Sequence, residues 1–380
     1  MKRLIIAISS IVLILAAGTA TFLVLRMFDA QNTQTSTGSE PSTPNLTATI
    51  VVDGLEHPWD IDFLPNGTAL FTERPGTISK IMNGEKTVIE SLDDVNAQGE
   101  GGLMGIAVDP DYDENKYIYA CYNSARDDVR VVRWEFDGSE LSEKTDIVTG
   151  IPTADSGRHS GCQTAFGPDG NLWIGTGDAA DEAQPQDQAK LGGKILRLTR
   201  DGTPASGNPE GPDKRVFSYG HRNTQALAFY PALQDDSYGV SIEHGPSQDD
   251  EVNELKPGNF GWAPGEGYDE SVPMTDTAKF PLAIEHIWTS GNSTIAPSGA
   301  AFLRGEAWGR LEGWLAVSVL KDQKLMLLNV SNGSVNGARV LFEGKYGRLR
   351  AATLGTDGAL YVSTDNGSND AILKIVPTQP

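Results

Sequence analysis

The stretch TAFGPDGNLWIGTGD (residues 164–178) decides the fold class of this chain. It consists of a small apolar strand, a Pro-Asp-Gly turn and a second strand in which apolar and small residues alternate. Asp-Gly between two such runs is a strong signal for a tight antiparallel hairpin, because the turn needs backbone conformations with positive φ. The stretch therefore predicts a two-stranded unit of an antiparallel sheet.

The same phrase recurs along the chain with insertions of different lengths. The other copies are IDFLPNGTALFTE (61–73), IAVDPDYDENKYIYACY (106–122), LAFYPALQDDSYGVSIE (227–243), AAFLRGEAWGRLEGWLAVSV (300–319) and ATLGTDGALYVSTDNG (352–367). Six repeated antiparallel units with no convincing helix predict a β-propeller, which leaves few exposed strand edges. A two-sheet sandwich would not need six copies of one phrase. We expect an all-β, six-bladed propeller of four-stranded antiparallel blades.

The composition agrees with many short strands, and the net charge excludes one class of partner. The 380 residues include 42 Gly and 21 Pro, and 30 basic residues face 51 acidic ones, for a net charge of −21. So acidic a chain repels nucleic acid, which excludes DNA or RNA as a partner. The two cysteines, Cys121 and Cys162, are too few for a zinc cluster. They form either one disulfide or two buried thiols.

The N-terminal segment has the pattern of an export signal. Lys2 and Arg3 precede an apolar run over residues 4–25, long enough to cross a bilayer as a helix. Residues 1–28 are either a signal peptide or, by slight preference, an uncleaved anchor, and both place the remainder outside the cytoplasm. Residues 29–47 are Ser/Thr-rich and predict a flexible linker. The propeller is expected to cover residues 48–380.

Candidate functional residues lie in the loops, which converge on one face of a propeller. His159 precedes the third copy of the phrase and Asp178 ends its returning strand. A hairpin brings these two positions to the same end of one blade. A His held by a carboxylate is the usual arrangement of a general base near neutral pH. A structural His and an Asp in a turn are the alternative interpretations.

Charged residues in later loops predict sites for an anion and a cation. Arg222 in YGHRN suits an oxyanion or a carboxylate, or it braces a blade junction. Arg348 and Arg350 alternate along a strand-like segment and share a face, and with Lys321 they suit a polyanion. The segment EHGPSQDDEVN (243–253) combines carboxylates with turn carbonyls, which suits Ca²⁺, although a solvated acidic loop is the simpler interpretation.

Together these motifs resemble the soluble pyrroloquinoline quinone (PQQ)-dependent sugar dehydrogenases, also called glucose/sorbosone or aldose sugar dehydrogenases. The resemblance runs from about Gly54 to Pro377. Its most specific motifs are GEGGLMGIAVDPDY, RHSG, LWIGTGD, GGKILRL, SYGHRN, EHGPSQDDEVN, NFGWAPGEG, IAPSG and GRLRAATLGTDGALYVSTD. That family is six-bladed, in agreement with the repeat count.

The resemblance implies a role for each candidate. His159 would remove the proton of the sugar's anomeric hydroxyl while hydride passes to the quinone, Asp178 would orient His159, and Arg222 would stabilise negative charge on the quinone oxygen. The residues implied to hold the cofactor are Glu100, Asn223, Thr294, Lys321, Arg348 and Arg350. Those implied for calcium are the carbonyls of Gly245 and Pro246 and, for a second ion, Asp249, Asp250 and Glu251.

Departures from the family pattern indicate which branch of the family the chain resembles. Glu100 stands where the glucose enzymes have Gln, and the segment IWTSGNSTIAPSG (287–299) lacks their aromatic residues, which favours the aldose branch. The region between the fourth and fifth repeats lacks the insertions that form a dimer in some members. We therefore expect a monomer that acts on an aldose, passes electrons to an external acceptor and contacts a membrane only through its N-terminal segment.

Two other functions are compatible with a six-bladed propeller. A Ca²⁺-dependent lactonase would hold one axial metal with Glu, Asn and Asp side chains and would need no cationic cluster, so Lys321 and the Arg348–Arg350 pair argue against it. A recognition propeller without chemistry is possible because fold alone does not give function. The joint presence of His159, Asp178 and Arg222 argues against that alternative.

Overall fold

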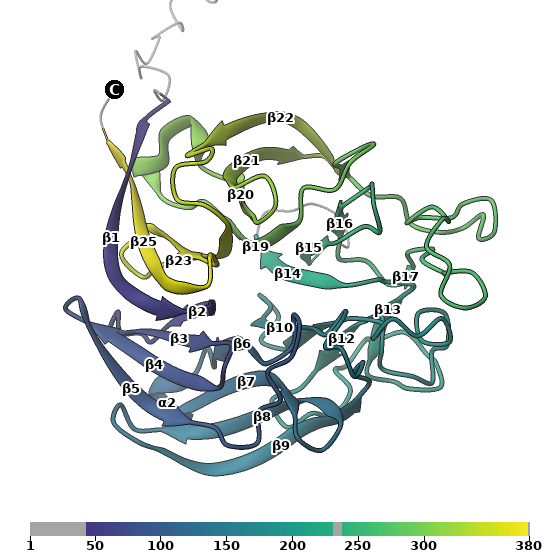
Figure 1. The fold of residues 1–380 in the computed structure, drawn as a ribbon, viewed down its shortest axis with the longest axis horizontal. Helices are drawn as coiled ribbons and strands as arrows, with labels where there is room; N and C mark the ends of the chain where they lie inside the picture. Colours follow the sequence, from purple (N-terminus) through teal and green to yellow (C-terminus); the bar gives the residue numbers. More distant parts are fainter. Residues whose placement is uncertain (1–42, 231–237, 379–380) are drawn as a thin grey trace, which may run out of the picture. The chain divides into compact units, whose positions relative to one another are not determined.

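The computed structural model describes residues 43–230 and 238–378, which fold into a ring of six β-sheets (Figure 1). The predicted six-bladed, all-β propeller of four-stranded antiparallel blades is confirmed. The predicted N-terminal helix and most of the predicted linker lie outside the described residues. Within the described ranges, no helix is long and apolar enough to cross a membrane. The helices found there are short, α2 (Tyr112–Asn115) and η1 (Glu306–Leu311).

Each copy of the repeated phrase supplies the first two strands of one sheet. The first three sheets contain β2 (Pro58–Phe63), β3 (Ala69–Glu73), β4 (Thr77–Met82) and β5 (Glu85–Ser91); β6 (Leu103–Val108), β7 (Tyr117–Ser124), β8 (Asp128–Phe136) and β9 (Leu141–Ile151); and β10 (Gly161–Phe166), β11 (Leu172–Thr176), β12 (Lys194–Leu198) and β13 (Val216–Tyr219). The last three contain β14 (Thr224–Phe229), β15 (Gly239–Glu243), β16 (Glu251–Glu254) and β18 (Trp288–Thr289); β19 (Pro297–Phe302), β20 (Leu315–Val319), β21 (Lys324–Ser331) and β22 (Ser334–Leu341); and β23 (Leu349–Leu354), β24 (Leu360–Thr364), β25 (Ser368–Thr378) and β1 (Asn45–Glu56).

The ring is closed at both its inner and its outer edge. The first strand of each sheet contacts the first strand of the next, and β23 contacts β2. At the outer edge β1 pairs antiparallel with β25, from Asn45 opposite Thr378 to Glu56 opposite Ser368. Strand β1 begins at Asn45, so the last residues of the predicted linker belong to the propeller. The N-terminal strand thus completes the sheet that the C-terminal strands build.

The third sheet shows how the predicted hairpin forms. Gly170 has φ +72° and its N–H donates to the carbonyl of Gly167, which closes the turn between β10 and β11. Asp169 accepts hydrogen bonds from the N–H of Asn171 and from Nε1 of Trp173. All five residues of β11 are buried, because neighbouring sheets cover both of its faces. Each large apolar side chain buried in this way contributes about 1.5–3 kcal/mol.

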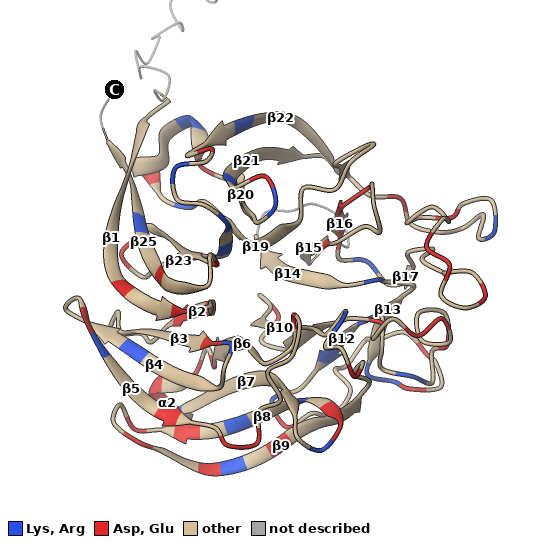
Figure 2. Cartoon of the chain, viewed as in Figure 1, with Lys and Arg blue, Asp and Glu red and all other residues tan. Residues whose placement is uncertain are grey.

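Charge on the outer strands is mixed. Acidic and basic residues both occur along β8 and β9 (Figure 2). Several of them form ion pairs within and between strands, such as Arg130 with Asp128 and Asp146. The acidic residues of these two strands therefore do not form an anionic patch.

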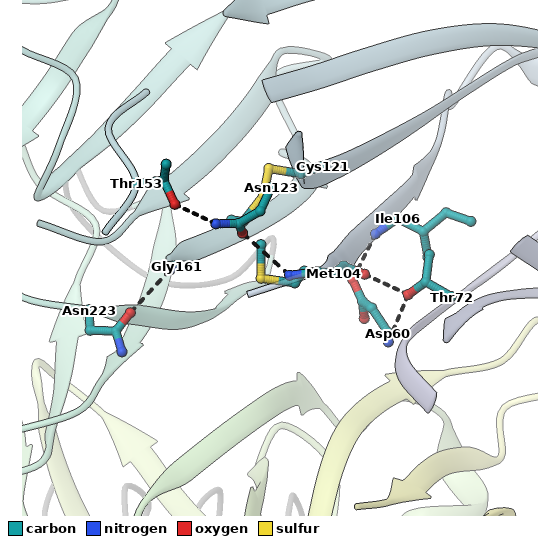
Figure 3. The surroundings of a disulfide bond; sticks show 11 residues. Asp60, Thr72, Met104, Ile106, Cys121, Asn123, Thr153, Gly161 and Asn223 are labelled. Carbon is teal, nitrogen blue, oxygen red and sulfur yellow. Dashed lines mark hydrogen bonds between the residues drawn. A yellow bond between two sulfur atoms is a disulfide. The ribbon is translucent and has the colours of Figure 1, made fainter. Parts of the chain in front are cut away.

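A disulfide joins the second sheet to the third. Cys121 of β7 and Cys162 of β10 are bonded, which resolves the alternative left open by the sequence (Figure 3). Nearby, Asn123 Nδ2 donates to Thr153 Oγ1, and Asn223 Oδ1 accepts the N–H of Gly161. The loop that the bond closes spans 41 residues. In the chain-entropy model such a closure stabilises the folded state by about 4 kcal/mol.

One connection departs from the regular propeller. After β16 the chain returns to the third sheet, where β17 (Gly258–Asn259) pairs in parallel with β13. It then comes back to the fourth sheet as β18, which pairs with β16. The irregular segment 260–287 therefore starts at the third sheet and ends at the fourth. This segment carries residues to the site described next.

Candidate active site

Two adjoining cavities lie at the end of the ring where the innermost strands begin. The first has a volume of about 210 Å³, and the predicted residues that line it are Glu100, His159, Arg222, Asn223, Gly245, Asp250 and Thr294. The second has a volume of about 340 Å³, and the predicted residues that line it are Glu100, Arg348 and Arg350. Glu100 lines both cavities, so the structure brings most of the predicted residues to one place.

His159 and Asp178 form the pair that the hairpin geometry predicts. His159 stands just before β10 and Asp178 just after β11, where Gly161 lies opposite Thr176. The Nδ1 atom of His159 is 2.8 Å from Oδ1 of Asp178. Both residues are buried, with 4% and 0% of their surfaces exposed. A buried carboxylate at this distance fixes the ring with the proton on Nδ1.

The other ring nitrogen is available for chemistry. Among the described residues none makes a hydrogen bond to Nε2 of His159, and the residue lines the first cavity. With Nδ1–H donated to Asp178, the Nε2 lone pair can accept a proton from a group in that cavity.

Two glycines make the close approach of these segments possible. A Cβ on Gly177 would lie 1.8 Å from the carbonyl oxygen of His159, and one on Gly161 would lie 2.2 Å from the nitrogen of Gly177. Gly161 also has φ +58°, which a side chain would strain. The glycines of RHSG and GTGD are therefore required by the contact between the two backbones.

Arg222 is a buried cation in the wall of the first cavity, with 4% of its surface exposed. Its Nη1 donates to the carbonyl of His244, at 2.9 Å. Its Nε and Nη2 donate to Oε1 of Glu270, at 3.1 and 2.5 Å. Partial burial would raise the pKa of Glu270, but the hydrogen bonds and charges of Arg222 and Arg158 lower it. Glu270 thus stays ionised and holds Arg222 in place.

Three residues that the sequence patterns did not assign to the site, Trp262, Tyr268 and Glu270, complete this half of it. Trp262 Nε1 donates to Oδ2 of Asp178 at 2.8 Å, and Tyr268 donates to the same oxygen at 2.6 Å. They and Glu270 belong to the segment 260–287. The motif NFGWAPGEG marked this segment, but no repeat spacing places it. Its position depends on the parallel pairing of β17, which links distant parts of the chain.

His221 and His244, the histidines of the motifs SYGHRN and EHGPSQDDEVN, are unsuited to act as a base. His221 is fully buried between Oε1 of Glu243, 2.5 Å away, and Oγ of Ser218, 2.7 Å away. His244 places Nε2 2.7 Å from the carbonyl of Pro297. Burial, reinforced by the charge of Arg222, lowers the pKa of His244 to about 3, so it is neutral at physiological pH.

Glu100 and Asn223 fix the backbone beneath the site. One oxygen of Glu100 accepts the backbone N–H of His159, and the other accepts Nδ2 of Asn223 at 3.0 Å. Oδ1 of Asn223 accepts the N–H of Gly161 at 3.1 Å. The loop before β6 is thereby tied to the start of β10 and β14. Both carboxylate oxygens of Glu100 have donors before any ligand binds.

The cationic side is more open. In the described part of the chain Lys321 has no carboxylate partner; its Nζ donates to the carbonyl and Oγ1 of Thr294, at 2.7 and 3.1 Å. The side chain of Arg348 is 42% exposed, and its Nε donates to the carbonyl of Asp365. Arg350 is buried, 3.5 Å from the ring centre of Trp59, and pairs with Asp365. Lys321 and Arg348 therefore keep donors free for an anion.

The predicted metal ligands are distributed differently. Asp250 accepts the N–H groups of Gly245, Ile295 and Ala296, so its carboxylate ties two loops at the cavity wall. Asp249 accepts Oγ1 of Thr289, whereas Glu251 binds Thr275 and Asn253. Pro246 is partly exposed beside Gly245. The structure thus does not bring the carboxylates of Asp249, Asp250 and Glu251 to one point.

Within the described residues one group of three has ligand atoms close enough to share an ion: His57, Asp365 and Asp370. Its carboxylates already have protein donors, because Asp365 pairs with Arg350 and Asp370 accepts backbone N–H groups of the turn before β25. These contacts join the first and last sheets, so the group has a structural role in the folded chain.

Comparison with known proteins identifies relatives of this chain. Residues 55–374 match the sequence model of a family described as Glucose / Sorbosone dehydrogenase. Aldose sugar dehydrogenase YliI of Escherichia coli is 30% identical, covering 89% of this chain and 94% of that protein. Quinoprotein glucose dehydrogenase B of Acinetobacter calcoaceticus is 29% identical over 59% of this chain and 54% of that protein. The PQQ-bound structure of aldose sugar dehydrogenase from Streptomyces coelicolor superposes with a TM-score of 0.72, at 32% identity, covering 88% of this chain and 99% of that chain.

Proposed function

The chain belongs to the glucose/sorbosone dehydrogenase family, and on that premise we propose that it oxidises an aldose at the anomeric carbon to the lactone in a PQQ-dependent reaction. One observation carries the proposal. A buried His159, whose Nδ1 is held by Asp178 and whose Nε2 has no hydrogen-bond partner among the described residues, lines a cavity that adjoins a second one lined by Arg348 and Arg350.

The donors present fit the cofactor. PQQ carries three carboxylates, and Lys321 and Arg348 offer positively charged donors that are only partly used by protein groups. Arg350 adds a buried positive charge in the wall of the second cavity. When bound, PQQ supplies a two-electron oxidant that takes hydride from the sugar. The protein holds the cofactor, orients the sugar and removes the proton of its hydroxyl.

We propose these roles for the chain's own residues. Nε2 of His159 accepts the proton of the anomeric hydroxyl, and Asp178 stabilises the imidazolium that results. Arg222 presents a buried, preorganised positive charge to the same cavity, which stabilises negative charge that develops there. Glu100 and Asn223 keep the backbone of His159 in register.

Calcium is part of the proposal. The carbonyls of Gly245 and Pro246 would hold the ion, and oxygen is the ligand that Ca²⁺ prefers. In support, Gly245 lines the first cavity and its N–H is fixed by Asp250. The carboxylates of Asp249, Asp250 and Glu251 have separate donors, so we restrict the proposal to the first ion.

We also propose that the propeller works outside the cytoplasm as a monomer and passes its electrons to an external acceptor. The apolar run over residues 4–25 supports export, as anchor or signal peptide. The disulfide between Cys121 and Cys162 supports an oxidising compartment, because such bonds rarely persist in the cytosol. The absence, between the fourth and fifth repeats, of the insertions that form a dimer in some family members supports the monomer.

The proposal is tested with the full chain, reconstituted with PQQ and Ca²⁺. We expect a panel of aldoses to reduce an artificial electron acceptor, and we expect removal of PQQ or of Ca²⁺ by a chelator to abolish the reaction. His159→Ala is expected to lose turnover while keeping its melting temperature. No reaction with any aldose, or full activity in His159→Ala, would overturn the proposed function.

A further inference from the structure

We propose that Tyr268 is a positioning residue for the pair of His159 and Asp178, and that its hydroxyl sets how much negative charge the carboxylate offers to the imidazole. This inference rests on the function proposed above, because it concerns the basicity of the group that takes the sugar's proton. It assigns a role to a residue that does not line the cavity and that no sequence motif singled out.

The hydroxyl of Tyr268 touches both members of the pair. It donates to Oδ2 of Asp178 at 2.6 Å and lies 2.9 Å from Nδ1 of His159. The other oxygen of Asp178 accepts Nδ1 of His159 and the N–H of Ala180. The two carboxylate oxygens are thus divided: Oδ1 serves the imidazole, whereas Oδ2 is satisfied from the segment that carries Tyr268.

Tyr268 is fixed in place from several sides. Its backbone has φ +62°, an uncommon conformation for a bulky residue, which persists only where the surroundings impose it. Its N–H donates to Glu182, and the guanidinium carbon of Arg158 lies 5.4 Å from its ring centre. Paired backbone bonds between Gly265 and Asp269 close the loop around it. The hydroxyl is held at Asp178 before any ligand binds.

The hydroxyl remains a donor at every working pH. Burial, together with the charge of Asp178, raises the pKa of Tyr268 well above its ordinary range. A hydrogen bond from a neutral O–H to a carboxylate is charge-assisted and disperses part of the negative charge. A carboxylate that loses this donor offers more charge to its remaining partner, and that partner is the Nδ1–H of His159. Removal of the hydroxyl should therefore make the imidazole more basic.

Loss of the contact between the tyrosine oxygen and Nδ1 acts in the opposite direction, but a neutral oxygen is a weaker acceptor than an anionic one. The larger effect is therefore the one on Asp178. The other charged or titratable groups near the pair are Glu100, Arg158, Glu182, Lys194, Arg222, His244 and Glu270. A Tyr268→Phe substitution leaves all of them in place, so a change in titration reports on the hydroxyl.

Tyr268→Phe tests the inference in the full-chain enzyme reconstituted with PQQ and Ca²⁺. We expect the acid limb of the kcat/KM profile to move up by about half a pH unit, which is a modest fraction of the change produced by a direct charge partner. We expect kcat to fall about 3- to 10-fold, less than the full contribution of a general base, because the substitution removes two contacts that hold the imidazole and Asp178 in position. The KM for the sugar should change less than about twofold, because Tyr268 itself does not line the cavity and its hydroxyl donates to Asp178.

A second measurement does not depend on turnover. In the protein without cofactor, ¹⁵N NMR of labelled histidine, with His159→Gln to assign the resonance, follows the titration of the ring. Tyr268→Phe should move that titration in the same direction. The matched control is Tyr361→Phe, which removes a tyrosine donor to Asp357 on the last sheet and should move neither measurement. Trp262→Phe, which removes the other donor to Oδ2, should move both in the same direction as Tyr268→Phe.

The outcomes separate this inference from the proposed function. An unchanged pH profile together with an unchanged NMR titration would overturn the role of Tyr268, even if kcat falls. A shift to lower pH would also overturn it. If the wild type oxidises no aldose but the NMR titration still moves upward, the proposed function fails and the coupling of Tyr268 to the pair stands.

Discussion

The two halves of the site are built in contrasting ways. On the side of the third and fourth sheets, His159, Asp178 and Arg222 are almost completely buried and each has a side-chain partner from a distant segment. On the side of the fifth and sixth sheets, Lys321 is exposed and Arg348 is 42% exposed. The buried half is therefore organised before anything binds, whereas the open half keeps charge available for a ligand. We expect substitutions in the first to affect turnover and substitutions in the second to affect cofactor affinity.

The largest expected effect comes from the buried half. His159→Gln should lower kcat by about 10²- to 10⁴-fold, because it removes the proposed general base while retaining a polar side chain. The affinity for PQQ, measured by titration of the cofactor into the protein, should change by less than about threefold, since no charge that faces the anion is removed. If this variant instead lost affinity for PQQ but kept normal turnover at saturating PQQ, the assignment of turnover to the buried half and of cofactor affinity to the open half would be wrong.

Lys321→Ala tests the open half. A charged hydrogen-bond donor contributes about 1.5–3 kcal/mol, so the dissociation constant for PQQ should rise by about 10- to 150-fold. At saturating cofactor kcat should remain close to that of the wild type. Lys324→Ala is the matched control, because Lys324 lies on the same sheet but is already paired with Asp322. An equal loss of affinity in both variants would show that general charge, and not the position of Lys321, is responsible.

The disulfide links Cys162, close in sequence to His159, to Cys121 of the second sheet. The double substitution Cys121→Ala and Cys162→Ala should lower the free energy of unfolding by about 2–4 kcal/mol, measured by denaturant titration. At temperatures well below the melting point the variant should keep most of its kcat, because Asp178, Glu100 and Tyr268 still hold the histidine. A loss of kcat larger than that of His159→Gln would mean that the bond itself orients the base.

The smallest expected effect is on the pH dependence of the free energy of unfolding. It concerns Asp60 and Asp62, which line a separate cavity of about 380 Å³. Burial raises the pKa of Asp60 from 3.8 to about 7 and that of Asp62 to about 6. The folded state therefore favours the protonated carboxyls. The stability that they contribute is complete below about pH 4 and is lost as the pH rises through 6 to 7.

Asp60→Asn removes one of these titrations. We expect the free energy of unfolding of the wild type to fall between pH 5 and pH 8, and that of the variant to fall less, by a difference on the order of 1–2 kcal/mol. Denaturant titrations at the two pH values measure it. In contrast to Asp178, which has donors from His159, Trp262 and Tyr268, Asp60 is bound by backbone N–H groups alone. A parallel pH dependence in both proteins would show that Asp60 is ionised throughout.

Much of this architecture follows from local sequence. The hairpin phrase predicted the innermost pair of strands in all six sheets, because the turn residues and the alternation act over a few positions. The same argument placed His159 and Asp178 at one end of a blade. The roles of Tyr268 and Glu270 could not be predicted in this way. They reach the site because β17 pairs in parallel with β13, a contact between distant segments with no local signal.

The disulfide and the start of the propeller show the same limit. Cys121 and Cys162 lie on different sheets and meet only when the ring has formed, so spacing left their pairing open. No copy of the repeated phrase includes β1, and its partner β25 lies at the other end of the propeller sequence. Local patterns therefore fix each sheet, whereas the closed ring decides which distant residues become neighbours.

The pairing of β1 with β25 has a consequence for the order of events during synthesis. Thr49 leaves the ribosome 325 residues before its partner Lys374. Until then the last blade lacks its outer strand, and β1 presents an unpaired edge to any other strand nearby. So late a closure implies slow folding, since distant contacts cost chain entropy before they stabilise. Strand β1 is therefore exposed to pairing with a wrong strand until translation is complete.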